Sequence, residues 1–369
     1  MAASSPADDR PESAAVNPST YRDADAFQRD RSLLQRHWQY AGDRRDLPAH
    51  LDSLALEVSG LPVLLVNDGG TIRGFINSCR HRGSELRPPG IGHGPLVCPY
   101  HAWSYRADGV LAGVPRAEAF PARPACNRGS TALHPVGVLE VGDLLFVQAR
   151  PAADLDRTAR TREWAMTQAV VAGTRIADTT YEVAADWKVV LENALEGYHI
   201  PLVHRETFAP VSLPGGHDRY AALGPHSEGA GGTDAATQAR WERLLRLLPD
   251  RPLADPHYRH RLVFPNTCLW TFFGCILGIT TATPTGPGTS RVTVRMYQTP
   301  IPPTAPPAAG QLLAAMAGMM VPFIARVQAE DNAICEAQQR GLAGAQDLGV
   351  LGSDERRVAA FREAYVAVH

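Results

Sequence analysis

The amino-acid sequence predicts an α+β protein in which a small all-β domain is followed by a domain of helices and an antiparallel sheet. The first observation is a series of short runs rich in Val, Leu and Ile within residues 41–155, separated by turn signals such as Asn-Asp-Gly-Gly. The second is the mixture of helical and strand patterns in residues 156–369. The third is the length of 369 residues, which exceeds the roughly 250–300 that a single core serves.

Two segments precede the all-β domain. Residues 1–20 are rich in Ala, Ser, Pro and Asp, which predicts a disordered leader rather than a signal peptide. In residues 21–40 the apolar and aromatic side chains fall at helical spacing among Arg, Asp and Gln. We therefore expect an amphipathic N-terminal helix that packs on the second domain.

The elements of the two domains are expected in the following order. Strands of the all-β domain should lie between Leu54 and Cys79 and again up to Gln148. In the second domain we expect, in chain order, a helix around 186–199, a mobile Gly-rich loop at 213–234, strands at 261–283 and 290–299, and a helix at 311–340 that breaks at Pro322.

Charge and hydropathy exclude several classes of partner. Lys and Arg total 36 against 38 Asp and Glu, and no block of like charge indicates nucleic acid or an anionic membrane. The longest weakly polar stretch, Leu312–Ala325, is shorter than the roughly 20 residues of a spanning helix. We expect a cytoplasmic protein. In a reducing compartment, its six cysteines are more typical of metal binding than of a disulfide framework.

The first candidate metal site lies in the all-β domain. It consists of two short pairs, Cys79-x-His81 and Cys98-x-x-His101, each beside Gly or Pro. Zinc sites commonly pair Cys with Cys and His with His. Mixed pairs are what a Rieske cluster needs, because one iron takes both Cys and the other takes both His. The pattern therefore favours a 2Fe-2S cluster over structural zinc.

The other histidine and cysteines near this pattern are not expected to bind metal. We expect His93 to hydrogen-bond the backbone, and Cys126, Cys268 and Cys275 to be buried apolar thiols.

The second candidate metal site combines two histidines with a distant carboxylate. His199 and His204 are five positions apart, so on a regular helix they would diverge, but Pro201 between them can distort or end the helix. Asp331 falls on the apolar face of a C-terminal helix, where an ionised carboxylate is costly unless it is paired or bound to metal. Glu330 is better explained as solvated or as a hydrogen-bond acceptor behind a ligand. Two His and one carboxylate form the facial triad of non-haem Fe(II) oxygenases.

Both patterns resemble one family. Residues Cys79 to Trp103 resemble the Rieske motif of non-haem iron oxygenase large (alpha) subunits, the aromatic-ring-hydroxylating oxygenase family. The second pattern resembles that family's catalytic domain through a set of residues in the same order, namely Asp186-Trp187-Lys188, Glu192-Asn193, Glu196, Tyr198-His199 and His204.

The resemblance implies a set of ligands. A 2Fe-2S cluster would be held by Cys79, His81, Cys98 and His101, and Fe(2+) by His199, His204 and Asp331. Glu196 would link His199 to His101 of a neighbouring subunit in a homotrimer. The family uses Asp more often at the position of Glu196, and the spacing from Glu-Asn to His is one residue shorter than in naphthalene-type enzymes. Both features resemble the betaine, carnitine and choline oxygenase branch, and we assign no role to Asn193.

The function expected from this resemblance is that of an oxygenase component. It would use O₂ and electrons from a separate NAD(P)H-dependent reductase, with or without a ferredoxin, because no GxGxxG pattern is present. The substrate would be a small betaine-like, amine or natural-product molecule that is hydroxylated or demethylated; the alternative is an aromatic-ring dihydroxylating dioxygenase. Trp270, Phe272 and Phe273 are candidate pocket walls, although core packing explains them equally well.

Three functions of other classes stay open on these residues. A Rieske electron carrier would need only the first domain, a zinc-stabilised binding protein would be colourless, and a His-His-Asp hydrolase would act without O₂.

Overall fold

The computed structural model describes residues 16–120, 131–150, 173–209, 219–231, 235–246, 248, 258–301 and 303–368. The chain divides into two compact units, one formed by Met1–Asp30 with Val171–His369 and the other by Arg31–Val170. The domain boundaries given above stay predictions. Cys126 and residues 1–15 of the expected leader lie outside the described residues, whereas Pro18–Tyr21 forms a short 3-10 helix.

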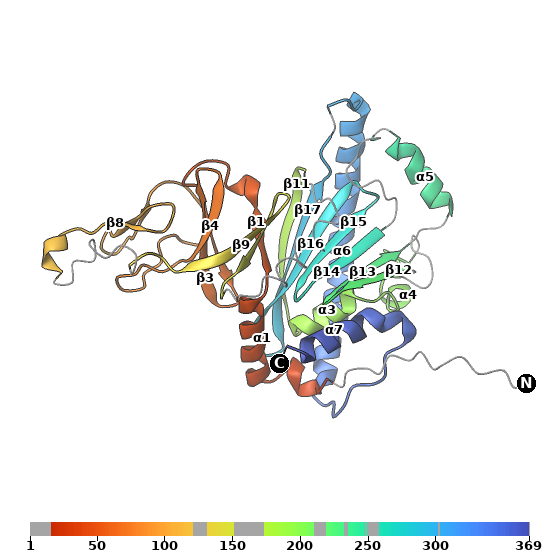
Figure 1. Ribbon diagram of the computed structural model, residues 1–369. Helices are drawn as coiled ribbons and strands as arrows, with labels where there is room; N and C mark the ends of the chain where they lie inside the picture. Colours follow the sequence, from red (N-terminus) through yellow and green to blue (C-terminus); the bar gives the residue numbers. More distant parts are fainter. Residues whose placement is uncertain are drawn as a thin grey trace, which may run out of the picture. The chain divides into compact units, whose positions relative to one another are not determined.

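The unit of Arg31–Val170 is built from antiparallel strands, as the sequence predicts (Figure 1). Within its described residues, a seven-stranded sheet has the order β1-β10-β9-β4-β3-β2-β5, and a three-stranded sheet has the order β6-β7-β8. The strands are β1 (Gln39–Asp43), β2 (Ser53–Val58), β3 (Leu61–Asp68), β4 (Thr71–Ile76), β5 (Gly90–Gly92), β6 (Leu96–Val97), β7 (Ser104–Tyr105), β8 (Leu111–Gly113), β9 (Pro135–Val141) and β10 (Leu144–Gln148).

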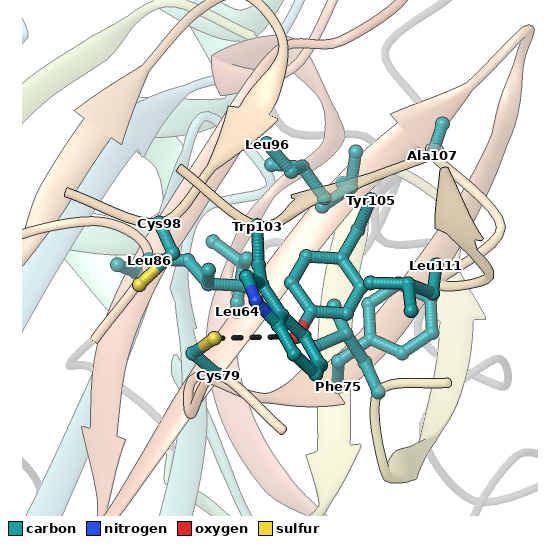
Figure 2. Packing of buried hydrophobic residues seen from close by; sticks show 13 residues of the cluster. Leu64, Phe75, Cys79, Leu86, Leu96, Cys98, Trp103, Tyr105, Ala107 and Leu111 are labelled. Atoms are coloured by element: carbon teal, nitrogen blue, oxygen red, sulfur yellow. Dashed lines mark hydrogen bonds between the residues drawn. The ribbon is translucent and has the colours of Figure 1, made fainter. Parts of the chain in front are cut away.

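Strand β3 shows how this sheet is held. Its side chains alternate between two buried clusters, with Leu64 and Val66 in one and Val63 and Leu65 in the other. Successive side chains of a strand point to opposite faces, so a continuous apolar run can cover both faces of a central strand. The cluster of Leu64 also contains the two cysteines of the first candidate site (Figure 2). The hydrophobic core therefore fixes the base of that site.

The other unit is a seven-stranded antiparallel sheet with helices, in the order β11-β17-β16-β15-β14-β13-β12 over its described residues (Figure 1). Its strands are β11 (Arg175–Val183), β12 (Arg219–Leu223), β13 (His226–Gly231), β14 (Tyr258–Val263), β15 (Thr267–Phe272), β16 (Ile276–Gly286) and β17 (Thr289–Gln298). The α-helices among the described residues are α1 (Ala24–Arg36), α3 (Trp187–Ala194), α4 (Ile200–Val203), α5 (Ala235–Leu245), α6 (Pro307–Leu342) and α7 (Arg356–Val366).

The structure corrects two expectations in this unit. The Gly-rich segment 213–234 is not simply a mobile loop, because its described part contains the hairpin of β12 and β13. Gly224 takes a positive φ of 58° in the turn, and the small side chains of β13 are buried where that strand pairs with β14. The Gly-rich composition of this segment predicts a loop, but small residues also suit a strand whose faces are closely covered.

The second correction concerns helix α6, which does not break at Pro322. Proline removes one backbone donor and crowds the carbonyl four residues earlier. Here Gly318 and Pro322 are both exposed, so water can satisfy the freed carbonyl. Among the described helices, α6 alone is long and apolar enough to cross a membrane, by length and composition only. The apolar part of α6 is thus longer than the stretch Leu312–Ala325 identified from the sequence. Within this unit the helix packs against α3 and β11.

Helix α3 is anchored by a buried charge cluster. Asp186 caps the helix by accepting from the backbone N–H of Lys188 at 2.9 Å, and the Lys188 ammonium contacts both Asp30 and Asp186. The indole N–H of Trp187 donates to Asp30 at 2.9 Å. The Asp-Trp-Lys sequence therefore holds the start of α3 against the N-terminal segment.

We expect Lys188→Ala to lower the free energy of unfolding by about 3–5 kcal/mol, because it leaves two buried carboxylates without their counter-charge. Denaturant titration measures this change. Arg291→Ala is the matched control, since its pair with Glu182 is exposed and should contribute about 0–1 kcal/mol. Equal effects for the two variants would contradict the role given to Lys188.

Candidate metal centres

The two Cys/His loops of the first site share one backbone arrangement. In each loop the cysteine N–H donates to the carbonyl five residues further on, at 2.8 Å. The cysteine carbonyl accepts from the N–H four residues further on, which belongs to Gly83 at 2.9 Å and to Ala102 at 3.0 Å. Both of those residues have positive φ, at 78° and 55°. The loops therefore turn back sharply just beyond each cysteine.

This arrangement brings together the four residues named from the sequence. Cys79 and Cys98 are buried free thiols. The rings of His81 and His101 have centroids 4.7 Å apart, and His81 stacks on Trp103. The Nδ1 atom of His81 is buried and has no hydrogen-bond partner. An unpaired buried imidazole nitrogen is costly unless a ligand satisfies it, so the donor set fits a metal cluster with sulfur and nitrogen ligands.

The surroundings of the thiols support the same conclusion. The Tyr105 hydroxyl lies 3.3 Å from the Cys79 sulfur (Figure 2). Burial raises the pKa of Cys79. Burial also acts to raise the pKa of Cys98, but backbone N–H groups of Tyr100 and His101 outweigh it and hold that pKa below its ordinary value. Burial lowers the pKa of His81, which favours the neutral ring that a metal ligand requires.

The tip of this site is exposed. The Tyr100 ring stacks on His101 with centroids 3.8 Å apart, and the Arg82 guanidinium lies over the Tyr100 ring. One expectation here is wrong: His93 pairs with the Asp52 carboxylate at 2.7 Å rather than with the backbone. Cys268 and Cys275 are buried thiols, as expected.

The second site forms where α3 ends and the one-turn helix α4 follows. His199 precedes α4 and His204 follows it, and Pro201 lies in its first turn. The helix around 186–199 is therefore shorter than expected, because α3 ends at Ala194. A single turn between the two histidines brings their rings together, with centroids 5.1 Å apart.

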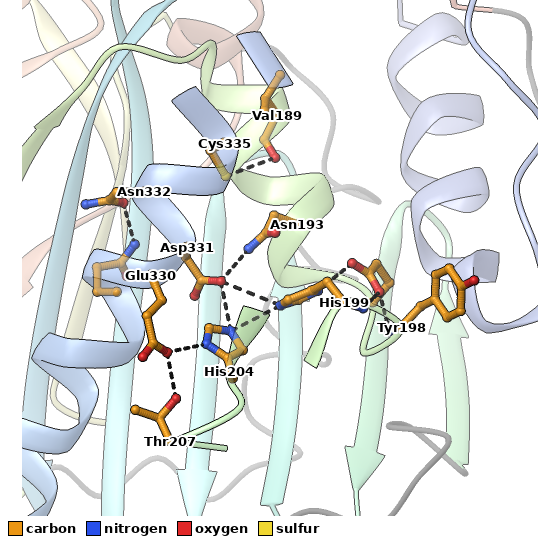
Figure 3. Close-up of polar contacts among 12 residues, drawn as sticks. Val189, Asn193, Tyr198, His199, His204, Thr207, Glu330, Asp331, Asn332 and Cys335 are labelled. Atoms are coloured by element: carbon orange, nitrogen blue, oxygen red, sulfur yellow. Dashed lines mark hydrogen bonds and ion pairs between the residues drawn. The ribbon is translucent and has the colours of Figure 1, made fainter. Parts of the chain in front are cut away.

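Asp331 on α6 completes the group (Figure 3). The Nε2 atoms of His199 and His204 are 3.2 Å apart, and the Asp331 Oδ1 lies 3.5 Å from the first and 3.0 Å from the second. The ligand atoms of these three residues all lie within 4.8 Å of one another, close enough to hold one metal ion. Val327 and Cys335 are buried on the same helix, whereas Ile334 is 41% exposed.

The other ring nitrogen of each histidine faces a carboxylate. His199 Nδ1 lies 2.5 Å from Glu196 Oε1, and His204 Nδ1 lies 2.7 Å from Glu330 Oε2, which also accepts from the Thr207 hydroxyl. Such contacts fix the tautomer and direct both Nε2 atoms to one point. Contrary to expectation, Glu196 does not lie in a helix but between α3 and α4. Its Oε2 accepts hydrogen bonds from the backbone N–H groups of Tyr198 and His199.

Sequence reasoning missed Asn193. Its side-chain amide donates to Asp331 Oδ1 at 2.8 Å, the same oxygen that faces both histidines (Figure 3). No spacing in the sequence relates these residues, which are 138 positions apart.

The electrostatics of the site favour a cation. Burial acts to raise the pKa of Asp331, but hydrogen bonds from His199 and His204 hold it below its ordinary value. Burial acts to lower the pKa of His199, but the carboxylates of Asp331 and Glu196 raise it to about 9. Three carboxylates around two imidazoles therefore attract positive charge, which a divalent metal ion supplies when bound.

We expect Asn193→Ala to weaken mononuclear iron binding by roughly ten-fold to a hundred-fold, because Asp331 loses the donor that orients it. Competition with a chelator measures the affinity. Asn332→Ala on α6 is the control, since the Asn332 side chain accepts from Gln328 whereas it is Asn193 that donates to Asp331. An unchanged affinity in Asn193→Ala would contradict the orienting role.

A cavity of about 630 Å³ opens beside these ligands. His199, His204 and Asp331 line one part of it, and its walls are mainly apolar. The candidate wall residues Trp270, Phe272 and Phe273 all line it. Phe272 and Phe273 come from the end of β15 and the turn after it.

Two parts of the chain match known protein families. Residues 37–125 match the family of the Rieske [2Fe-2S] domain, and residues 172–368 match the family of the ring hydroxylating alpha subunit (catalytic domain). The glycine betaine monooxygenase oxygenase subunit of Chromohalobacter salexigens is 34% identical over 182 residues, which are 48% of this chain and 40% of that protein. The carnitine monooxygenase oxygenase subunit of Acinetobacter baumannii is 26% identical over 50% of this chain and 51% of that protein. The matches thus span about half the length of these relatives.

Solved structures share the fold. The quaternary ammonium Rieske monooxygenase CntA with inhibitor MMV12 has a TM-score of 0.77 at 19% identity and covers 97% of this chain and 96% of that one. Naphthalene 1,2-dioxygenase from Rhodococcus sp. has a TM-score of 0.75 at 18% identity, over 96% and 94%. The predicted α+β fold is thereby confirmed. With its catalytic-domain match over more than half of its length, the chain belongs to the ring hydroxylating alpha subunit family and carries a Rieske [2Fe-2S] domain.

Proposed function

We propose that this chain is the oxygenase component of a Rieske non-haem iron oxygenase, which hydroxylates or oxidatively demethylates an organic substrate. The observation that carries the proposal is the convergence of His199, His204 and Asp331 at the wall of an apolar cavity. A Rieske electron carrier has no need of that second site, which argues against the carrier as the function.

The cofactors of the family are a 2Fe-2S cluster and a mononuclear iron. In this chain we assign the cluster to Cys79, His81, Cys98 and His101, and Fe(2+) to the second set, His199, His204 and Asp331. When bound, the iron supplies O₂ activation and the cluster supplies electrons. An iron held by these three residues would keep open coordination positions, and the apolar walls of the cavity beside them would exclude water from the reacting group.

Glu196 is proposed to connect the two sites. Its Oε1 accepts from the Nδ1–H of His199, which leaves the Nε2 of that ring for iron. The exposed position of His101 lets its ring approach another subunit, so we propose that Glu196 faces His101 of a neighbouring subunit in a homotrimer. A separate NAD(P)H-dependent reductase, with or without a ferredoxin, would reduce the cluster in the cytoplasm.

The relatives support a reaction at an amine. Two relatives are oxygenase subunits of glycine betaine monooxygenase and carnitine monooxygenase, and a third is the alpha subunit of an N,N-dimethyl phenylurea N-demethylase. The alternative, dihydroxylation of an aromatic ring, is favoured by the aromatic lining of the cavity.

The test is reconstitution of the protein with iron and sulfide, followed by spectroscopy and by O₂ uptake with a reductase and candidate substrates. The proposal expects a brown protein with a Rieske spectrum that consumes O₂ only when reduced. A colourless zinc protein, or turnover without O₂, would support the binding protein or the hydrolase instead.

In the same experiment, Cys98→Ser should lose the visible spectrum while still loading the mononuclear iron, since a cluster without one thiolate assembles poorly. Visible absorption and metal analysis read out the two sites separately. Cys268→Ser is the control, because that buried thiol lies outside both sites and should keep the full spectrum. A full spectrum in Cys98→Ser would contradict the ligand assignment.

A further inference from the structure

The cavity is much larger than the substrates named by the relatives require. At about 630 Å³ it lies within the roughly 300–1,000 Å³ of pockets that enclose drug-sized ligands. A molecule as compact as glycine betaine would leave most of that space unfilled. Because affinity for apolar ligands depends on close contact with the walls, the volume indicates a bulkier substrate.

The cavity is also elongated. One helix, α6, lines it from Leu312 to Asp331, and at the rise of an α-helix that interval is about 28 Å long. Three of the side chains between these ends are Met316, Met319 and Met320. Methionine side chains are unbranched and polarizable, and they adapt to ligands of irregular shape. An extended molecule could therefore contact α6 along its length while one end reaches the histidines.

Two polar side chains of the wall donate hydrogen bonds within the protein. The Trp270 indole N–H donates to the Thr280 hydroxyl at 3.0 Å, and the Gln328 amide donates to Asn332. Trp241 on α5 stacks on Phe273 with centroids 4.4 Å apart. What these residues offer a ligand is mainly apolar and aromatic surface.

The negative side chains of the cavity lie at the metal site, and a positive side chain lies on α5. Among the described lining residues, the carboxylates are Glu196 and Asp331, both committed to the metal site. Arg240 on α5 is exposed and also lines the cavity. Helix α5 lies away from α3 and α4 in this unit (Figure 1). Within the described part of the lining, a cationic substrate would meet no carboxylate other than these two, whereas an anionic group would meet Arg240.

We propose that the cavity takes an elongated, mainly apolar substrate that carries a carboxylate at its outer end, rather than a compact quaternary ammonium compound. The apolar body lies along the methionines of α6, the reacting carbon lies by His199 and His204, and the carboxylate pairs with Arg240. This inference rests on the proposed oxygenase function and specifies its substrate class.

The test is calorimetric binding to the oxidised, iron-loaded holoenzyme, which needs no turnover. The probes are dodecanoate and deoxycholate, each below its micelle concentration, with methyl dodecanoate and glycine betaine for comparison. We expect both acids to bind at least about ten-fold more tightly than glycine betaine. Arg240→Gln should lower the affinity for both acids by about ten-fold and leave the affinity for the ester unchanged. Arg243→Gln, on the same helix but outside the cavity lining, should leave the affinities for acids and ester unchanged.

A second variant tests the body of the cavity. Met316→Trp adds bulk to the wall and should weaken both acids and the ester. Tighter binding of glycine betaine than of either acid would overturn the proposal, and so would equal losses for acid and ester in Arg240→Gln. These outcomes are separate from a failure of the proposed function, which would appear as absent iron loading or absent O₂ uptake with every substrate.

Discussion

Asp331→Ala is expected to remove mononuclear iron and to lower turnover by at least about a hundred-fold, while the cluster spectrum stays intact. The substitution removes the oxygen that lies 3.0 Å from His204 Nε2 and 3.5 Å from His199 Nε2. Two imidazoles without the carboxylate lack both the third ligand and the negative charge. Metal analysis, visible absorption and O₂ uptake measure the three quantities on one sample.

Glu330→Gln is the matched control on the same helix. Its side chain contacts His204 Nδ1 and the Thr207 hydroxyl rather than the point where the Nε2 atoms meet. We expect the iron to remain bound, with a loss of affinity of roughly ten-fold to a hundred-fold. If Glu330→Gln lost its iron entirely while Asp331→Ala kept it, the ligand would be Glu330.

Glu196→Gln is expected to bind both cofactors, to reduce its cluster normally and to turn over about a hundred-fold more slowly. An amide keeps one carbonyl oxygen for the backbone N–H groups of Tyr198 and His199, so the turn before α4 can persist. It cannot accept from two imidazoles with two oxygens, which the proposed connection to His101 requires. Stopped-flow spectroscopy of cluster oxidation, with iron analysis, separates coupling from metal loss.

The subunit-crossing part of that prediction has its own experiment. A Cys98→Ser chain lacks the cluster and a His199→Ala chain lacks the iron site, so each should be inactive alone. In mixed oligomers, some neighbours pair an intact cluster with an intact iron site, and activity should return. Hybrids that form but remain inactive would contradict electron transfer between subunits.

The features predictable from sequence were those with a local signal. The strands of the Rieske domain follow from short runs rich in Val, Leu and Ile and from the turn residues between them. The short pairs around Cys79 and Cys98 place their ligands in adjacent loops. Asp331 was identified because a carboxylate on an apolar helix face needs a partner, and the structure puts it beside His199 and His204.

What sequence could not supply depends on tertiary contacts. The hairpin of β12 and β13 is joined to the sheet by the pairing of β13 with β14, a tertiary contact that its Gly-rich composition does not indicate. Asn193 contacts Asp331 only because α3 packs against α6. Likewise, the cavity takes its walls from β14, β15, α5 and α6, which no single stretch of sequence describes.

Because α6 continues through Pro322, one uninterrupted helix carries both a wall of the cavity and Asp331, the proposed carboxylate ligand of the iron. A ligand that displaced α6 would alter the position of Asp331 relative to His199 and His204, which flank α4. Thermodynamic linkage then requires reciprocity: if occupancy of the cavity changes the affinity for iron by some factor, iron changes the affinity for that occupant by the same factor. Any such coupling between metal retention and substrate fit would act through this one helix.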